Sequence, residues 1–206
     1  MSKDTPANRA QMRVRIAHLA ARMIAVDGVR DYGLAKRKAA RQAGAPDSRN
    51  LPTNLEVEDA LRAYQALYQA DEHPEYLHRL RRLALEMMRL LEPFNPHLTG
   101  PVLSGSAGRH AEIHLHLYTD DVKEVGVFLL NREIPFRTRE TRVWSGPLSL
   151  LVPSYLIASA EADFCITLLA SRLRRQPLRV SSDGRPLERA TIQSVESLIA
   201  NATHTQ

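Results

Sequence analysis

Cysteine, aromatic side chains and long apolar runs are all scarce in this sequence. Cys165 is the single cysteine among 206 residues. An internal disulfide and a zinc site built from several thiolates are therefore excluded within one chain. No apolar run approaches the ~20 residues that span a membrane, and the first residues lack the apolar core of a secretory signal. We expect a cytoplasmic protein with no membrane partner.

The composition is that of a globular protein with a mild excess of basic residues. Hydrophobic residues make up 44% and charged residues 25% of the chain, which argues against wholesale disorder. The 28 lysines and arginines outnumber 23 acidic residues and give a net charge of +5. Contact with a nucleotide or nucleic acid is compatible with this charge. Aromatic residues account for only 5% of the chain, so stacking surfaces for single-stranded nucleic acid are few.

The first half of the chain has the apolar spacing of amphipathic helices. Apolar residues recur every three or four positions, and glycine or proline follows each such stretch. The expected helices span residues 8–26, 32–42, 54–68 and 74–91. Asn54 is the expected cap of the third helix, and Pro93 and Pro96 end the fourth. Residues 45–54 hold several prolines, asparagines and aspartates and are predicted to form a loop.

After Pro101 the apolar period changes from about 3.6 to 2, which marks the strongest internal boundary. Ile113, Leu115 and Leu117 alternate with polar residues, as in a strand with one apolar face. The expected strands span residues 113–117, 134–144, 148–158 and 164–169, and the expected helices span 120–131 and 187–200. We therefore predict an α+β fold with a helical region at 1–96 and an α/β domain with a mixed sheet at 97–206.

The run from Leu103 to Leu115 resembles the core of the nucleotidyltransferase superfamily, which has the polymerase-beta-like fold. In that family a strand ends in Gly-Ser and the next strand opens with acidic, apolar and acidic residues. Gly105 and Ser106 match the first part, and Glu112 and His114 occupy the two acidic positions. The resemblance covers roughly residues 91–169 and implies a divergent bacterial member of the superfamily with a nucleotidyltransferase-like mixed sheet.

The resemblance also implies roles for individual residues. Gly105, Ser106 and Arg109 would contact a nucleotide, and Glu112 would be catalytic. Glu112 and His114 would bind Mg²⁺ or Mn²⁺. The third acidic position would fall on Asp163, which would then be catalytic, or on Cys165 if the strand register differs.

Two departures from the family pattern weaken the expected metal site. His114 stands where a second carboxylate belongs, and the connection from Ser106 to Glu112 is shorter than usual. Because Mg²⁺ prefers oxygen ligands, an imidazole in this position makes a poor magnesium site. The sequence therefore predicts a nucleotidyltransferase-like protein that binds a nucleotide or nucleic acid, with metal-dependent nucleotidyl transfer weak or lost.

The polar positions around the strand at 113–117 have two further interpretations. His110, Glu112, His114 and His116 would project from one strand face and could form a metal-binding row. Same-face neighbours on a strand lie ~7 Å apart, too far for all four to share one ion. The spacing therefore favours a solvated polar face. Cys165, within an apolar strand, is expected to be a small core residue.

The helical half supports an alternative function. Residues 16–44 resemble the opening of a TetR-type DNA-binding domain, but Pro46 and Pro52 interrupt the chain where a recognition helix would follow. Two packed amphipathic helices are the favoured interpretation. The basic cluster Lys36, Arg37, Lys38 and Arg41 could still contact phosphates. The alternative is a non-catalytic interaction protein whose basic helical half binds a protein partner, RNA or DNA.

The segment 183–190 is predicted to form a turn followed by a helix cap. It resembles a segment of the same group of nucleotidyltransferase-like bacterial proteins, some of which carry a cell-wall ligase name. The phosphate-binding loop Gly-x-x-Gly-Lys-Ser/Thr, with which an ATP-dependent ligase could hold its nucleotide, is absent from the sequence. Arg185 and Arg189 are the residues of this segment that could face a phosphate.

Overall fold

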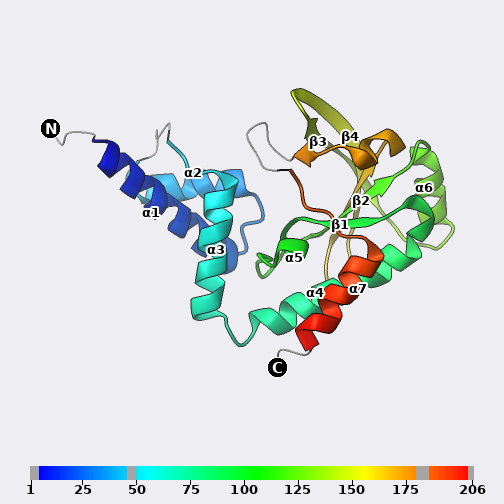
Figure 1. Ribbon diagram of the computed structural model, residues 1–206, viewed down its shortest axis with the longest axis horizontal. Helices are drawn as coiled ribbons and strands as arrows, with labels where there is room; N and C mark the ends of the chain where they lie inside the picture. The colour runs from blue at the N-terminus through cyan, green and yellow to red at the C-terminus, as the bar shows by residue number, and fades with distance from the viewer. Residues whose placement is uncertain (1–4, 46–49, 180–185, 204–206) are drawn as a thin grey trace. The chain divides into compact units, whose positions relative to one another are not determined.

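A computed structural model describes residues 5–45, 50–179 and 186–203 (Figure 1). The chain forms two compact units, one of residues 1–73 with 106–110 and the other of residues 74–105 with 111–206. The division therefore falls at residue 73, earlier than the expected boundary at 96 and 97, because the fourth helix belongs to the unit that contains the sheet. None of the described helices is both long enough and apolar enough to cross a membrane.

The first unit is built from α1 (Pro6–Ala25), α2 (Tyr32–Gln42) and α3 (Asn54–Tyr68). Helix α1 packs against both α2 and α3. Small side chains let the helix backbones approach closely, and Ile16 and Leu61 supply the larger buried groups. The buried alanines are Ala17, Ala20, Ala21, Ala25, Ala35, Ala39, Ala40, Ala43 and Ala60. The predicted range of α2 is confirmed residue for residue, while the predicted loop residues 46–49 lie outside the described part of the chain.

The N-terminus of α3 is capped by Thr53. The Thr53 hydroxyl accepts a hydrogen bond from the Glu56 amide at 3.2 Å, and the Glu56 carboxylate accepts one from the Thr53 amide at 2.7 Å. This reciprocal pair is a capping box. The prediction that Asn54 caps this helix is wrong, because the Asn54 side chain instead accepts a hydrogen bond from Lys36 at 2.8 Å.

Residues 106–110 fold into the first unit. The carbonyl oxygen of Ala107 accepts a hydrogen bond from Gln65 Nε2 at 2.9 Å and lies 3.0 Å from His73 Nε2. Gly108 lies so close to α1 that an added Cβ atom would be 2.9 Å from the carbonyl oxygen of Ile24. Glycine at position 108 is therefore required by packing within the helical unit.

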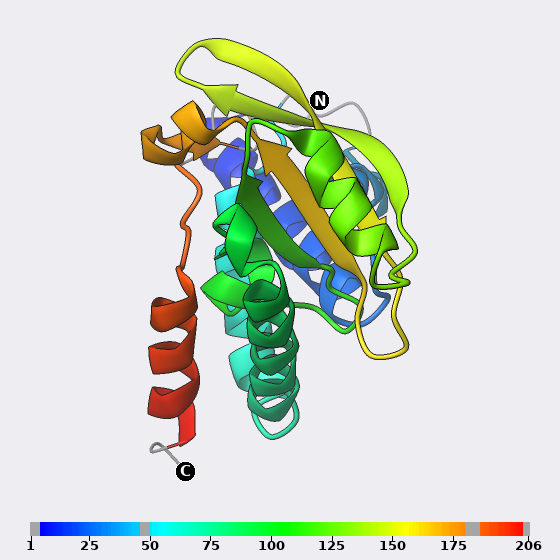
Figure 2. The ribbon, with the colours of Figure 1, turned by 90° about the vertical axis from the view of Figure 1, so that its right-hand side faces the viewer.

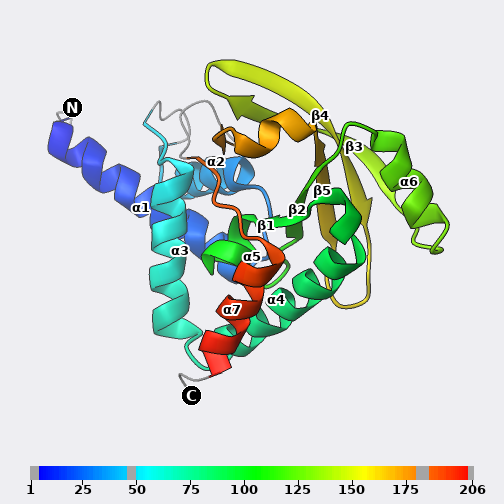
Figure 3. The ribbon, with the colours of Figure 1, turned by 45° about the vertical axis from the view of Figure 1, so that its right-hand side comes forward.

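The second unit contains a six-stranded mixed sheet whose strand order is β1-β2-β5-β4-β3-β6 (Figures 1 and 3). Strands β2 and β5 pair in parallel, and every other pair is antiparallel. The strands are β1 (His97–Thr99), β2 (Ile113–Tyr118), β3 (Arg137–Ser145), β4 (Leu148–Ile157), β5 (Phe164–Leu169) and β6 (Leu178–Arg179). The helices are α4 (His73–Leu90), η1 (Glu92–Phe94), α5 (Gly100–Ser104), α6 (Val122–Leu130), η2 (Ser171–Arg175) and α7 (Ile192–Thr203).

The predicted α+β class is confirmed, and most long elements fall close to their predicted ranges. Strand β5 has the predicted bounds. Helix α7 begins at Ile192, later than the predicted start at Leu187, because Ala190 instead exchanges two backbone hydrogen bonds of 2.9 Å with Leu98 of β1. The nucleotidyltransferase-like arrangement of the sheet stays a prediction.

One face of the sheet is apolar. Ile113, Leu115 and Leu117 of β2 are fully buried, and the parallel register places them beside Phe164, Ile166 and Leu168 of β5. Helices α4 and α6 lie over one face of the sheet (Figure 2). Their own fully buried residues include Leu80, Met88 and Leu129. The side chains of the alternate strand positions therefore point to the opposite face.

Replacing Gly108 with alanine tests the packing of residues 106–110. The new Cβ atom would press on the Ile24 carbonyl, which belongs to helix backbone and cannot move aside easily. Overpacking of this kind costs about 1–3 kcal/mol, and we expect the free energy of unfolding, measured in urea, to fall by that amount.

Gly33→Ala is the matched control. Gly33 lies in α2, and an added Cβ atom would meet only the ends of the Asp31 and Arg37 side chains, at 3.1 and 3.2 Å. The exposed Arg37 can move aside, but Asp31 also caps α2 by accepting a hydrogen bond from the Leu34 amide, which offsets part of the gain in helix propensity. The free energy of unfolding should therefore stay close to that of the wild type. If Gly108→Ala and Gly33→Ala were equally stable, the close packing of Gly108 against the Ile24 carbonyl would be contradicted.

Candidate functional site

The face of the sheet opposite the apolar one carries a row of polar side chains. His116 of β2 pairs with Thr167 of β5, and Thr167 pairs with Ser154 of β4. The Ser154 hydroxyl lies 3.2 Å from the Thr167 hydroxyl and 2.7 Å from that of Thr141 on β3. Polar groups thus cross four neighbouring strands on one face.

The prediction that this face is solvated is wrong at His116, whereas Glu112 and His114 are partly exposed. His116 exposes 5% of its surface, and Ser154 is fully buried. His110 does not extend the row, because β2 begins at Ile113. The alternation of polar and apolar residues correctly identified two faces, but it could not report that the polar face is buried around His116 and Ser154.

Three side chains with metal-binding atoms meet on this face. A carboxylate oxygen of Glu112, a ring nitrogen of His114 and the sulfur of Cys165 all lie within 4.8 Å of one another. The parallel register pairs His114 with Cys165, and Glu112 comes two residues before His114. Cys165 is buried, whereas Glu112 and His114 are partly exposed. We call these three residues the Glu-His-Cys triad.

Burial shifts the pKa values of Cys165 and His114. It raises the pKa of the Cys165 thiol, although Arg139 of β3 opposes this by donating a hydrogen bond to the sulfur at 3.1 Å. Burial lowers the pKa of His114. A protonated thiol and a neutral imidazole are therefore favoured near neutral pH in the metal-free protein.

Asp163 does not belong to the cluster. Its backbone carbonyl accepts a hydrogen bond from the Ile113 amide at 2.8 Å, which places it just before the first paired position of β5. Cys165 is the residue of β5 that meets Glu112 and His114. Of the two expected alternatives for the third family position, the strand register therefore selects the cysteine as the residue beside this pair.

The three expected nucleotide-binding residues are divided between the units. Gly105 ends α5 in the second unit, with a left-handed φ of 85°. Ser106 and Arg109 belong to the first unit, where Ser106 is buried and donates a hydrogen bond to the Glu58 carboxylate at 3.1 Å. Burial and the charge of Glu58 raise the pKa of the nearby Tyr32 to about 12. Ser106 therefore serves a buried polar cluster of the helical unit.

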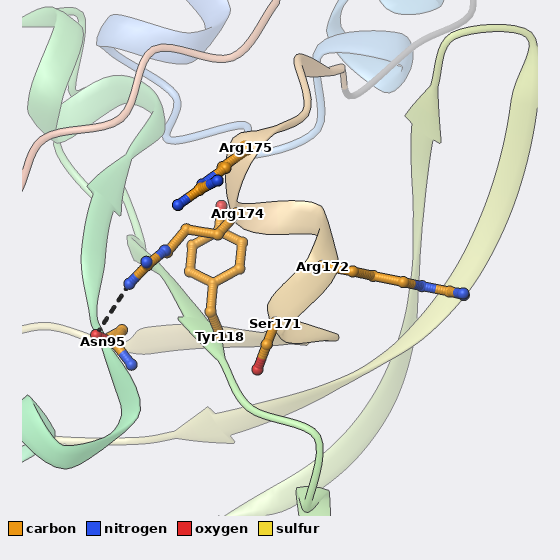
Figure 4. A pocket seen from close by; sticks show the side chains of 6 residues that line it. All are labelled: Asn95, Tyr118, Ser171, Arg172, Arg174 and Arg175. Carbon is orange, nitrogen blue, oxygen red and sulfur yellow. Dashed lines mark hydrogen bonds between the residues drawn. The ribbon is translucent and has the colours of Figure 1, made fainter.

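A second feature of the sheet unit is a basic pocket of about 400 Å³. Its lining residues are Asn95, Tyr118, Ser171, Arg172, Arg174 and Arg175. The short helix η2 supplies three arginines because its buried residue Leu173 directs the neighbouring side chains outward. Arg174 and Arg175 extend to one side of η2, near Tyr118, and Arg172 extends to the other (Figure 4). We call this feature the arginine pocket.

Positive charge dominates the surroundings of the arginine pocket. Arg189 donates hydrogen bonds to the Tyr118 hydroxyl at 2.7 Å and to the Arg174 carbonyl at 2.9 Å. Arg174 donates one to Asn95 at 3.3 Å. Within residues 5–45, 50–179 and 186–203, Arg172, Arg174 and Arg175 form no ion pair with a carboxylate. These three guanidinium groups therefore retain uncompensated charge.

The pKa shifts of the neighbouring groups agree with this field. Burial lowers the pKa of His97, and the charges of Arg189 and Arg174 lower it further. Burial raises the pKa of Tyr118, while its hydrogen bond from Arg189 opposes the rise. An anion in this pocket would be attracted by several arginines at once.

The arginines of η2 were not among the residues predicted from the sequence. The run Arg172, Leu173, Arg174, Arg175 directly after a buried strand was the available signal, because one apolar residue among three arginines indicates a basic turn. Arg189, predicted to face a phosphate, does lie beside the pocket residue Tyr118. Arg185 lies outside the described residues. In the helical unit, Arg37, Lys38 and Arg41 are exposed on α2.

Comparison with known proteins gives no assignment. No protein-family model, no curated protein and no solved structure matches the chain.

The buried His116 predicts a loss of stability in acid. Burial lowers its pKa to about 3, and the charges of His114, Arg189 and His97 act in the same direction. The unfolded chain, with an ordinary histidine pKa near ~6.5, therefore binds a proton first as the pH falls. Titration of His116 leaves the free energy of unfolding unchanged above pH ~6.5. Between pH ~6.5 and pH 3 the free energy of unfolding falls progressively, by up to about 1.4 kcal/mol per pH unit.

Urea unfolding between pH 7 and pH 4, with a chelator present, measures this dependence. The slope of the free energy of unfolding against pH gives the number of protons taken up on unfolding. In His116→Gln this number should fall by up to one. In His18→Gln, which changes an exposed histidine of α1, it should match the wild type. An unchanged slope in His116→Gln would show that His116 does not remain neutral in the folded protein.

Proposed function

We propose that the chain is a nucleotidyltransferase-like protein that binds a phosphorylated ligand, a nucleotide or a nucleic acid, with nucleotidyl transfer weak or lost. The observation that carries the proposal is the arginine pocket. Three arginines of one short helix line it, and within the described ranges none of them is neutralised by a carboxylate. Phosphate groups are the common biological anions that several guanidinium groups bind together.

The geometry of the arginine pocket fits a ligand with a charged and an uncharged part. Arg174 and Arg175 extend to the same side, so their guanidinium groups can approach one phosphate or two neighbouring phosphates (Figure 4). Tyr118 lines the pocket although it is only 2% exposed, and Asn95 and Ser171 add hydrogen-bonding groups. A volume of about 400 Å³ lies within the range of small-molecule sites.

The Glu-His-Cys triad supports the loss of transfer. Nucleotidyl transfer depends on Mg²⁺ that neutralises phosphate charge and activates the attacking oxygen. Mg²⁺ requires near-octahedral oxygen ligands, and the triad offers one carboxylate beside an imidazole and a thiol. These residues do not fit a magnesium centre, so no catalytic step is assigned to Glu112 or Asp163.

Binding of ATP, GTP, CTP and UTP, measured by thermal shift and by titration calorimetry, tests the proposal. We expect the melting temperature to rise with at least one nucleotide, because a ligand of the folded state stabilises it by mass action. Binding should persist in a chelator, since arginines make the phosphate contacts. The double variant Arg174→Gln/Arg175→Gln should raise Kd at least tenfold, as a lost hydrogen bond between charged groups costs about 1.5–3 kcal/mol.

The double variant Arg82→Gln/Arg137→Gln is the charge-matched control. Both of these arginines are exposed in the same unit, on α4 and β3, and it should bind as the wild type does. Equal weakening in both double variants would indicate attraction by net charge alone. Binding that is lost only when Arg37, Lys38 and Arg41 are changed would instead favour the basic helical half as the site.

A further inference from the structure

We propose that the Glu-His-Cys triad is a binding site for a late transition-metal ion of the Zn²⁺ type, in place of the Mg²⁺ or Mn²⁺ that the family likeness implies. The inference is independent of nucleotide binding. It rests on the meeting of three different ligand atoms on one sheet face, within 4.8 Å of one another.

The donor set selects the class of metal. One oxygen, one nitrogen and one sulfur are the ligands that zinc combines in proteins, where thiolate and imidazole are its commonest partners. A thiolate disfavours Mg²⁺ and Ca²⁺, which take oxygen ligands almost exclusively. Cys165 is the only cysteine of the chain, so a zinc site here needs the other two residue types.

The spacing of the three atoms fits a common ion after a small adjustment. A tetrahedral zinc ion lies about 2.0–2.2 Å from nitrogen and oxygen ligands and about 2.3 Å from sulfur, so its ligand atoms lie roughly 3.3–3.6 Å from one another. The three atoms lie within 4.8 Å of one another, so metal binding requires a rotation of the Glu112 or His114 side chain that brings the ligand atoms about 1 Å closer together. Glu112 and His114 are partly exposed, whereas Cys165 is buried.

Three protein ligands leave a fourth tetrahedral position for water or for an atom of a ligand. Arg139 lies beside this centre and donates its hydrogen bond to the Cys165 sulfur at 3.1 Å. A bound dication would replace Arg139 as the partner of the Cys165 sulfur, and its charge would be repelled by the Arg139 guanidinium. The structure therefore predicts that Arg139 limits the affinity of the site for metal.

Titration of the full chain with Co²⁺, a spectroscopic substitute for Zn²⁺, tests the proposal directly. We expect one Co²⁺ per chain with a sulfur-to-cobalt charge-transfer absorption, displaced by an equal amount of Zn²⁺ and unaffected by a large excess of Mg²⁺. Because the chain has a single thiol, this absorption reports Cys165 alone. Cys165→Ser should abolish it, and Glu112→Gln and His114→Gln should each weaken Co²⁺ binding at least tenfold.

Two further variants keep the test decisive if a triad variant fails to fold. Arg139 is exposed, so Arg139→Gln should fold normally, and it should tighten Co²⁺ binding several-fold by removing a nearby positive charge. His97→Gln, which changes an imidazole outside the triad, should leave the absorption and the affinity unchanged. Absence of the charge-transfer absorption in the wild type, or Co²⁺ affinity indifferent to Glu112, His114 and Arg139, would overturn the proposal.

Discussion

The parallel pairing of β2 with β5 is the constraint on which the arrangement of the sheet unit depends. It places Leu115 beside Ile166 on one face and His114 beside Cys165 on the other. A shift of this register by one residue would move every apolar side chain of β2 to the polar face. The apolar residues therefore fix the register, and the register in turn assembles the Glu-His-Cys triad.

The same strand pair positions the arginine pocket. Strand β5 continues into η2, whose Leu173 packs with Tyr118, Val143 and Leu178 in a small apolar cluster. Tyr118 is also the last residue of β2, so the end of the strand pair supplies both the anchor of η2 and one wall of the pocket. Burial of one leucine thus leaves the neighbouring arginines at the surface.

The buried polar row requires that its members remain uncharged or bonded. The hydroxyls of Ser154, Thr167 and Thr141 hydrogen bond to one another. His116 Nδ1 has no hydrogen-bond partner within the described part of the chain. An unpartnered buried nitrogen costs stability.

The sequence allowed the long elements to be predicted because their periodicity is strong. The helix at 32–42 and the strand at 164–169 were identified with their observed bounds. The short strand β1 and the helix η2 were missed, because segments of three to five residues carry too little pattern. Glu112 and His114 were identified through their likeness to a family motif, and the structure brings them together.

Other parts of the site could not be predicted from local sequence. The partnership of Cys165 with Glu112 depends on the register between strands that are about fifty residues apart, which periodicity does not report. The Gly-Ser turn was expected to hold phosphate, whereas Ser106 bonds Glu58 and Gly108 packs against Ile24. Glycine and serine suit a phosphate-binding turn and a tightly packed segment equally well, so only the fold shows which of the two roles these residues have.

The arginine pocket of the sheet unit is the site that we propose for the binding of phosphate groups. The most direct measurement is nuclear magnetic resonance of the 23.2 kDa chain, in which the backbone amides and the arginine side-chain Nε–H groups are followed during titration with a nucleoside triphosphate in the presence of a chelator. The account predicts saturable shifts centred on Arg174, Arg175 and Tyr118. Saturable shifts confined to the helical unit, or the absence of any saturable shift, would contradict it.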